Sequence, residues 1–147
     1  MLKPLNRIGM ANQYRQTFGC TQEEALKMAL FTRGYSYAFQ VLGYIMWDKD
    51  CSMEEALPYF DERMSEYCYD KILEDLSAAE KMFVSNLASS DRGKITAKEM
   101  ISRLGTNSKV YSVQRDRLVK KGIIDGSEYG SVSFALPRFE EYVRSVM

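Results

Sequence analysis

The sequence predicts a mainly α-helical chain with a small β-wing, in which a helical bundle precedes a winged helix-turn-helix domain. Three observations predict this fold class. Capping signatures of the form Ser/Thr-x-x-Glu recur along the chain and mark helix starts. Two amphipathic segments then follow each other across a short turn, and a glycine-bounded hairpin comes directly after them. This order divides the chain into a bundle at residues 1–75 and a winged helix-turn-helix domain at residues 76–147.

The bundle is predicted to be purely helical because no alternating strand pattern competes with its capping signatures. Pairs with the spacing of a capping box are Thr21 with Glu24, Ser52 with Glu55, and Ser77 with Glu80. The predicted helices span residues 5–18, 22–33, 36–49, 53–75 and 78–89. Pro58 is expected to start or kink part of the fourth helix, because proline removes a backbone donor. No Gly/Ser-rich linker follows that helix, so a preferred orientation of the two parts is expected.

The predicted helix at residues 36–49 has almost no polar face. One interpretation is a central core helix that its own chain covers. The other is a helix whose apolar patch docks on a partner. Its apolar residues are Tyr37, Phe39, Val41, Leu42, Tyr44, Ile45, Met46 and Trp47.

The winged helix-turn-helix domain is predicted from its caps and stops. Thr96 and Glu99 form a further capping box, and Gly105 can supply the left-handed residue that ends this helix. Side-chain oxygens that can cap the next helix belong to Thr106, Asn107 and Ser108. That helix is predicted at about residues 108–121, and Gly122 stops it. Its expected core-facing side chains are Val110, Val113 and Leu118.

The wing is predicted from the residues that follow Gly122. A short apolar strand at residues 123–124 leads to a tight tip at residues 126–130. Residues 131–136 then alternate between apolar and polar side chains, as a half-buried strand does. Pro137 ends this strand, and a closing helix is expected from Phe139 to Val146.

Composition excludes several classes of function. The chain has no histidine, which removes histidine-based triads and most zinc sites. Its three cysteines, Cys20, Cys51 and Cys68, are widely spaced and are expected to be reduced structural thiols. No apolar run is long enough to cross a membrane, and the N-terminus lacks a signal-peptide core, so no membrane partner and a cytoplasmic location are expected.

The net charge of zero hides an uneven distribution. Residues 1–90 carry 9 Lys and Arg against 13 Asp and Glu, whereas residues 91–147 carry 11 against 7. One interpretation is that the basic half meets a polyanion. The other is that the acidic and basic halves attract each other.

Four ordered motifs together resemble the C-terminal part of bacterial and archaeal AAA-type ATPases related to origin-recognition initiators. They are Gly34-Tyr35-Ser36-Tyr37-Ala38-Phe39-Gln40 followed by Gly43 and Trp47, Leu76-Ser77-Ala78-Ala79-Glu80, Arg115 to Ile124, and Phe134 to Phe139. The resemblance covers nearly the whole chain. It implies a lid that closes over nucleotide bound on a preceding P-loop ATPase core, which is the expected partner and would use ATP and Mg.

This chain itself contains no Gly-x-x-x-x-Gly-Lys-Ser/Thr motif, so no ATP hydrolysis and no cofactor are expected of it. The resemblance implies a nucleotide contact from Gly34, Tyr35 or Tyr37, with a plain role at a helix start as the alternative. Related lids often place proline where this chain has Ser36.

For the winged helix-turn-helix domain, two functions are considered. In the first, it contacts duplex DNA, and its second helix faces the major groove. The candidate DNA-binding residues are Lys109, Ser112, Arg115, Lys120, Lys121 and Tyr129. In the second, the domain docks on the ATPase core or on a protein partner, and Arg115 pairs within the chain. An enzyme is the third choice, because the adjacent carboxylates Asp61 with Glu62 and Glu54 with Glu55 do not form a converging acid/base pair.

Overall fold

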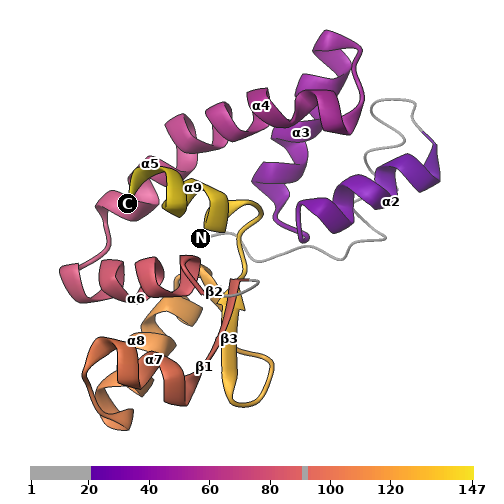
Figure 1. Ribbon diagram of the computed structural model, residues 1–147. Coiled ribbons are helices and arrows are strands. Elements are labelled where there is room, and N and C mark those ends of the chain that lie inside the picture. The colour runs from indigo at the N-terminus through magenta and orange to yellow at the C-terminus, as the bar shows by residue number, and fades with distance from the viewer. Residues whose placement is uncertain (1–20, 91–92) are drawn as a thin grey trace. The chain divides into compact units, whose positions relative to one another are not determined.

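A computed structural model describes residues 21–90 and 93–147 of the chain (Figure 1). These residues are mainly helical and include a small three-stranded antiparallel sheet, which confirms the predicted fold class. Within these ranges, no helix has both the length and the apolar character needed to cross a membrane. The predicted helix at residues 5–18 and Cys20 lie outside the described residues.

The chain divides into two compact units, residues 2–68 and residues 69–147, here called the N-terminal and C-terminal units. The division falls ahead of the domain boundary predicted at residues 75 and 76. In the N-terminal unit, the described elements are α2 (Gln22–Phe31), α3 (Ser36–Lys49), α4 (Met53–Met64) and most of the π-helix η1 (Ser65–Tyr69). The core of this unit includes Met28, Leu42, Phe60 and Met64, all buried.

The prediction of a single α-helix at residues 53–75 is wrong in the middle of that range. Ser52 and Glu55 form both arms of the predicted capping box, and Pro58 lies inside α4. The helical run then changes to the π-helix η1 before it continues as α5 (Asp70–Glu74). A π-turn holds an extra residue, so the positions that follow shift around the helix axis, and apolar periodicity alone does not reveal this.

Helix α3 is buried along part of its surface only. Phe39, Leu42 and Ile45 are buried, whereas Tyr44 and Trp47 keep 48% and 62% of their surface exposed. Helix α3 is therefore not a core helix that is covered on every side. Exposed rings at the end of α3 instead leave part of its apolar surface open to solvent.

The C-terminal unit places three helices and a sheet in the order expected of a winged helix-turn-helix. Its sheet has the strand order β1-β3-β2, and all pairs are antiparallel. Helices α6, α7 and α8 pack on one another, and Figure 1 shows the β2–β3 loop extending beyond the strands. After α5, the elements are α6 (Ala78–Ala88), β1 (Lys94–Thr96), α7 (Ala97–Leu104), α8 (Ser108–Lys120), β2 (Ile124–Asp125), β3 (Ser131–Phe134) and α9 (Phe139–Val146).

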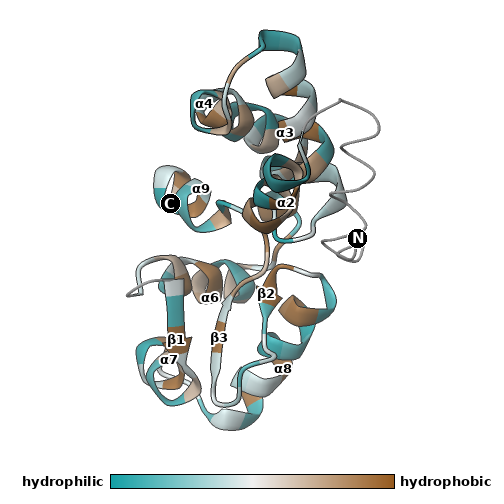
Figure 2. Cartoon of the chain, turned by 90° about the vertical axis from the view of Figure 1, so that its right-hand side faces the viewer, coloured by the Kyte–Doolittle hydropathy of each residue, from teal (hydrophilic) through white to brown (hydrophobic). Residues whose placement is uncertain are grey.

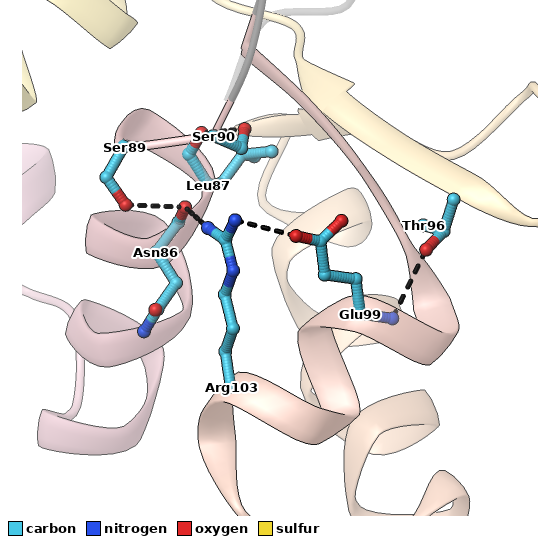
Figure 3. Close-up of polar contacts among 7 residues, drawn as sticks. All are labelled: Asn86, Leu87, Ser89, Ser90, Thr96, Glu99 and Arg103. Atoms are coloured by element: carbon cyan, nitrogen blue, oxygen red, sulfur yellow. Dashed lines mark hydrogen bonds and ion pairs between the residues drawn. The ribbon is translucent and has the colours of Figure 1, made fainter.

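Strand β1 was not predicted, and it changes the capping of α7. Thr96 is both the last residue of β1 and the N-cap of α7, and its hydroxyl accepts a hydrogen bond from the Glu99 amide at 3.2 Å. The Glu99 carboxylate, which the capping-box prediction turned back toward Thr96, pairs instead with Arg103 at 2.7 Å. Figure 3 shows the Arg103 guanidinium between Glu99 and the Asn86 carbonyl, to which it donates at 3.4 Å. Arg103 thus links α7 to the C-terminal turn of α6.

An aromatic cluster closes the core of the C-terminal unit around α9. The Phe139 ring is fully buried and lies 4.9 Å from the Tyr69 ring, centroid to centroid. The Tyr69 hydroxyl donates to the Pro137 carbonyl at 2.5 Å. The Tyr142 hydroxyl donates to the Asp70 carboxylate, and burial, followed by that carboxylate, raises the pKa of Tyr142. Both hydroxyls therefore have partners inside a largely apolar cluster.

Candidate nucleic-acid interface

Helix α8 turns one face to the core and the opposite face to solvent. Asn107 caps it, and the Asn107 side chain accepts from the Val110 amide at 2.9 Å. Tyr111 and Leu118 are buried, and the Tyr111 ring stacks on Phe83 with centroids 5.7 Å apart. Because these two residues are seven positions apart, they lie on the same side of the helix. The predicted residues on the solvent side are Lys109, Ser112 and Lys120, all exposed.

The predicted core-facing stripe of α8 is wrong for two of its three residues. Val110 and Val113 keep 40% and 46% of their surface exposed, and only Leu118 is buried as predicted. The buried aromatic residue is Tyr111, which fixes the inward face one position away from Val110. Figure 2 shows hydrophobic positions interrupting hydrophilic ones along α8. The solvent face of this helix is therefore mixed, with valines beside lysines.

Arg115 contacts its own protein and connects α8 to the wing. Its Nη2 donates to the Gly126 carbonyl at 2.8 Å, and its Nη1 pairs with Asp116 at 3.1 Å. A Cβ atom at Gly126 would lie 2.3 Å from that Nη2, so a larger residue there would require the Arg115 guanidinium to shift. Arg115, which was predicted to contact DNA, therefore holds the start of the wing against α8.

Lys121 also has a partner within the C-terminal unit. Its Nζ lies 2.8 Å from Oε2 of Glu80, whose side chain is 6% exposed. The other Glu80 oxygen accepts from the Ser77 amide at 2.9 Å, which completes the predicted capping box of α6. Burial by itself would raise the pKa of Glu80, but the hydrogen bonds from Lys121 and Ser77 outweigh burial and lower it. Lys121 therefore holds the end of α8 against the start of α6.

The lowered pKa of Glu80 predicts a pH-dependent contribution to stability. A carboxylate with a lowered pKa stabilises the fold above the ordinary glutamate pKa, and this stabilisation is lost as pH falls through the lowered value. We expect Glu80→Gln to reduce the free energy of unfolding by about 1–2 kcal/mol near neutral pH. The difference in the free energy of unfolding between Glu80→Gln and the wild type should shrink as the solution is acidified below the ordinary glutamate pKa. Urea unfolding across that range measures it, with the exposed Glu141→Gln as control; a gap that does not depend on pH would contradict the assignment.

The wing tip presents one tyrosine directly after two engaged carboxylates. The Asp125 carboxylate accepts from the Ser127 amide at 2.9 Å, and Glu128 pairs with Lys94 of β1. Tyr129 is fully exposed at 101% of its reference surface, and Gly130 follows it with a φ of +78°. The tip therefore offers an aromatic ring and a hydroxyl to a partner.

The helix-turn-helix and the wing lie inside one recognisable sequence family. Residues 66–143 match the family described as a domain of unknown function, DUF8462. The chain belongs to the DUF8462 family. The match runs from η1 into α9 and includes the helix-turn-helix and the wing. No curated protein and no solved structure matches the chain.

The DUF8462 region carries an excess of unengaged cations on its helix-turn-helix. Between residues 97 and 130, each carboxylate pairs with a cation or accepts from a backbone amide. By contrast, four exposed cations have no hydrogen-bonding or ionic partner among the described residues: Lys98, Lys109, Arg117 and Lys120. Sequence reasoning did not select Lys98 or Arg117. Lys98 could have been found from its place in the first turn of a helix that starts a helix-turn-helix.

The residues predicted to contact nucleotide lie outside the DUF8462 match, at the start of α3. Gly34 is buried with a φ of +73°, and its amide donates to the Ala29 carbonyl at 3.2 Å, which ends α2. Tyr35 is buried, and its hydroxyl lies 3.8 Å from Sγ of Cys68. Burial, and next the Cys68 thiol, raise the pKa of Tyr35. Gly34 and Tyr35 therefore have roles within the fold, Tyr37 is half-buried, and a nucleotide contact stays a prediction.

Proposed function

We propose that the DUF8462 region of this chain is a non-catalytic module that contacts duplex DNA through its phosphates. The observation that carries the proposal is the set of four unengaged cations on α7 and α8. Cations of this kind bind phosphates and release condensed counterions, which gives affinity without sequence specificity. Tyr129 at the wing tip adds a hydroxyl that can donate to the backbone. Arg115 and Lys121 position α8 and the wing.

The proposal predicts a steep dependence of duplex affinity on salt. If all four cations contact phosphates, the slope of log K against log salt should be about −3 to −4. Fluorescence anisotropy of the full chain with a labelled duplex, measured from about 50 to 200 mM salt, gives this slope. Two duplexes of unrelated sequence should bind alike. Absence of binding at the lowest salt would contradict the proposal.

Protein docking is the second candidate function, and one observation favours it. Val110 and Val113 lie one turn apart on α8 and keep 40% and 46% of their surface exposed. Apolar side chains on an exposed helix face are typical of helix-mediated protein contacts. The duplex titration separates the two candidates, because docking through valines requires no phosphate. A chain that fails to bind duplex at low salt would favour docking.

The wider role of the chain follows from the resemblance to AAA-type ATPases. We infer that a P-loop core, which would hold ATP and Mg, is the partner of this chain. In that arrangement, a nucleotide-dependent movement of the N-terminal unit would reorient the winged helix-turn-helix domain. The helical run from α4 through η1 to α5 supports this inference, because it crosses the division between the units with no flexible linker.

A further inference from the structure

The N-terminal unit contains an aromatic hollow that the proposed DNA contact does not use. It has a volume of about 260 Å³ and lies between α3 and the run of α4 and η1. Its wall contains three tyrosines, three carboxylates and two cations: Tyr44, Tyr59, Tyr67, Asp48, Glu62, Glu66, Lys49 and Arg63. Aromatic rings and acidic groups therefore converge on one small space.

The rings of this hollow are unusually open to solvent. Tyr44, Tyr59 and Tyr67 keep 48%, 47% and 63% of their surface exposed. Trp47 is 62% exposed, and its ring centroid lies 6.3 Å from that of Tyr44. Tyrosine and tryptophan are enriched at the energetic centres of protein interfaces. Three exposed tyrosines line the hollow, and an exposed tryptophan lies beside one of them, as is typical of a binding surface.

Two of these rings, those of Tyr59 and Tyr67, already lie under cations of their own chain. Nζ of Lys49 lies 4.1 Å from the centroid of the Tyr59 ring. Cζ of Arg63 lies 5.7 Å from the centroid of the Tyr67 ring. Both distances are within the range at which the negative face of an aromatic ring attracts a cation. The wall thus has the geometry that recognises ammonium and guanidinium groups.

The charges around the rings favour further cations. Asp48, Glu62 and Glu66 have no ion pair or hydrogen bond within residues 21–90 and 93–147 beyond the helix backbone. Lys49 and Arg63 lie over rings and pair with no carboxylate in the same ranges. The three carboxylates of the wall exceed its two cations by one charge, so the hollow keeps a net negative charge beside its aromatic faces. Such a surface repels a polyanion and attracts a basic group.

We propose that this hollow binds a basic peptide segment of a partner protein. An arginine or lysine of that segment enters between the tyrosine rings, and neighbouring basic residues pair with Glu62 and Glu66. The site is separate from α8 and the wing, so the DNA proposal can fail while this one holds. The partner proposed here is positively charged, whereas the duplex that we assign to the C-terminal unit is negatively charged.

Trp47 allows a direct test because it is the only tryptophan in the chain. The full chain is titrated at low salt with a short peptide of alternating arginine and glycine, while Trp47 emission is recorded. We expect a saturable change in emission, and none with the matching glutamate peptide. Glu62→Gln with Glu66→Gln should weaken binding about fivefold. Tyr59→Leu should weaken it about threefold, because a ring face is lost.

A control pair separates this site from general charge attraction. Glu23→Gln with Glu24→Gln removes the same charge from the exposed first turn of α2. Binding by this pair should equal that of the wild type. Equal weakening by both pairs would overturn the proposal. It would also be overturned by a peptide that binds without changing Trp47 emission, or by a chain that dimerises through this face before peptide is added.

Discussion

Replacing Lys109 and Lys120 together with alanine is expected to lower duplex affinity about tenfold at low salt and to reduce the salt slope by about 2. Both lysines are exposed on the solvent side of α8, and neither has an ionic partner within the described ranges. They lie eleven residues apart, or about three helical turns, so they fall on the same side of the helix. The loss should be uniform across sequences, because phosphate contacts carry no base information.

A charge-matched control distinguishes this effect from a change in net charge. Lys27→Ala with Lys71→Ala removes two exposed lysines from α2 and α5, which pair with Glu54 and Asp75. This control should keep the wild-type salt slope. If both double variants bound duplex equally weakly, α8 would not be the contact surface. If the α8 variant bound as the wild type does, Lys109 and Lys120 would not be phosphate ligands.

Val110 and Val113 allow a second test on the same helix, which distinguishes duplex binding from protein docking. Replacing both with serine removes exposed apolar surface but leaves every cation in place. Duplex binding through phosphates should then persist with an unchanged salt slope, whereas a docking surface would lose its apolar contacts. The mixed face of α8 therefore allows the two candidate functions to be tested by separate substitutions.

Local signals predicted much of the helical structure. Ser52 with Glu55 and Ser77 with Glu80 form both arms of their capping boxes, because all partners lie within one turn. Gly105 adopts a φ of +61° and ends α7 as predicted. These features depend on residues adjacent in sequence, so the sequence alone predicts them.

Features that depend on distant partners were missed. Strand β1 has only three residues, and it forms because Ile95 lies opposite Val132 of β3. Nothing near Ile95 in the sequence indicates that pairing. The π-helix η1 is likewise invisible to a search for a 3.6-residue period.

The candidate interface was predicted only in part, because it also depends on partners that are distant in sequence. Exposure of Lys109 and Lys120 follows from their places on an amphipathic helix. The engagement of Lys121 depends on Glu80, which lies 41 residues away. The engagement of Arg115 depends on a carbonyl in the wing, at Gly126, although a pairing of Arg115 within the chain was among the alternatives considered. Which cations remain unengaged is therefore a property of the tertiary structure.

Phe139→Ala is expected to cause the largest loss of stability, about 3–5 kcal/mol, because truncation of a buried phenylalanine leaves a cavity. Phe139 is fully buried. Its ring contacts Tyr69, Phe134 and Tyr142, with centroids 4.9, 5.5 and 5.6 Å away. One truncation therefore removes contacts to β3, to η1 and within α9. Urea unfolding followed by circular dichroism measures the change in the free energy of unfolding.

Two further variants show whether that loss comes from the cavity in the aromatic cluster. Phe139→Leu keeps most of the buried volume and should cost less than half as much as the alanine variant, because most of the space stays filled. Tyr129→Ala removes a fully exposed ring from the wing and should change stability by no more than about 0.5 kcal/mol. A loss below about 1 kcal/mol for Phe139→Ala would mean that the cluster around α9 is not the core of the C-terminal unit. Since α8 is positioned by that unit, a large loss would also predict weaker duplex binding by Phe139→Ala at temperatures where the variant is partly unfolded.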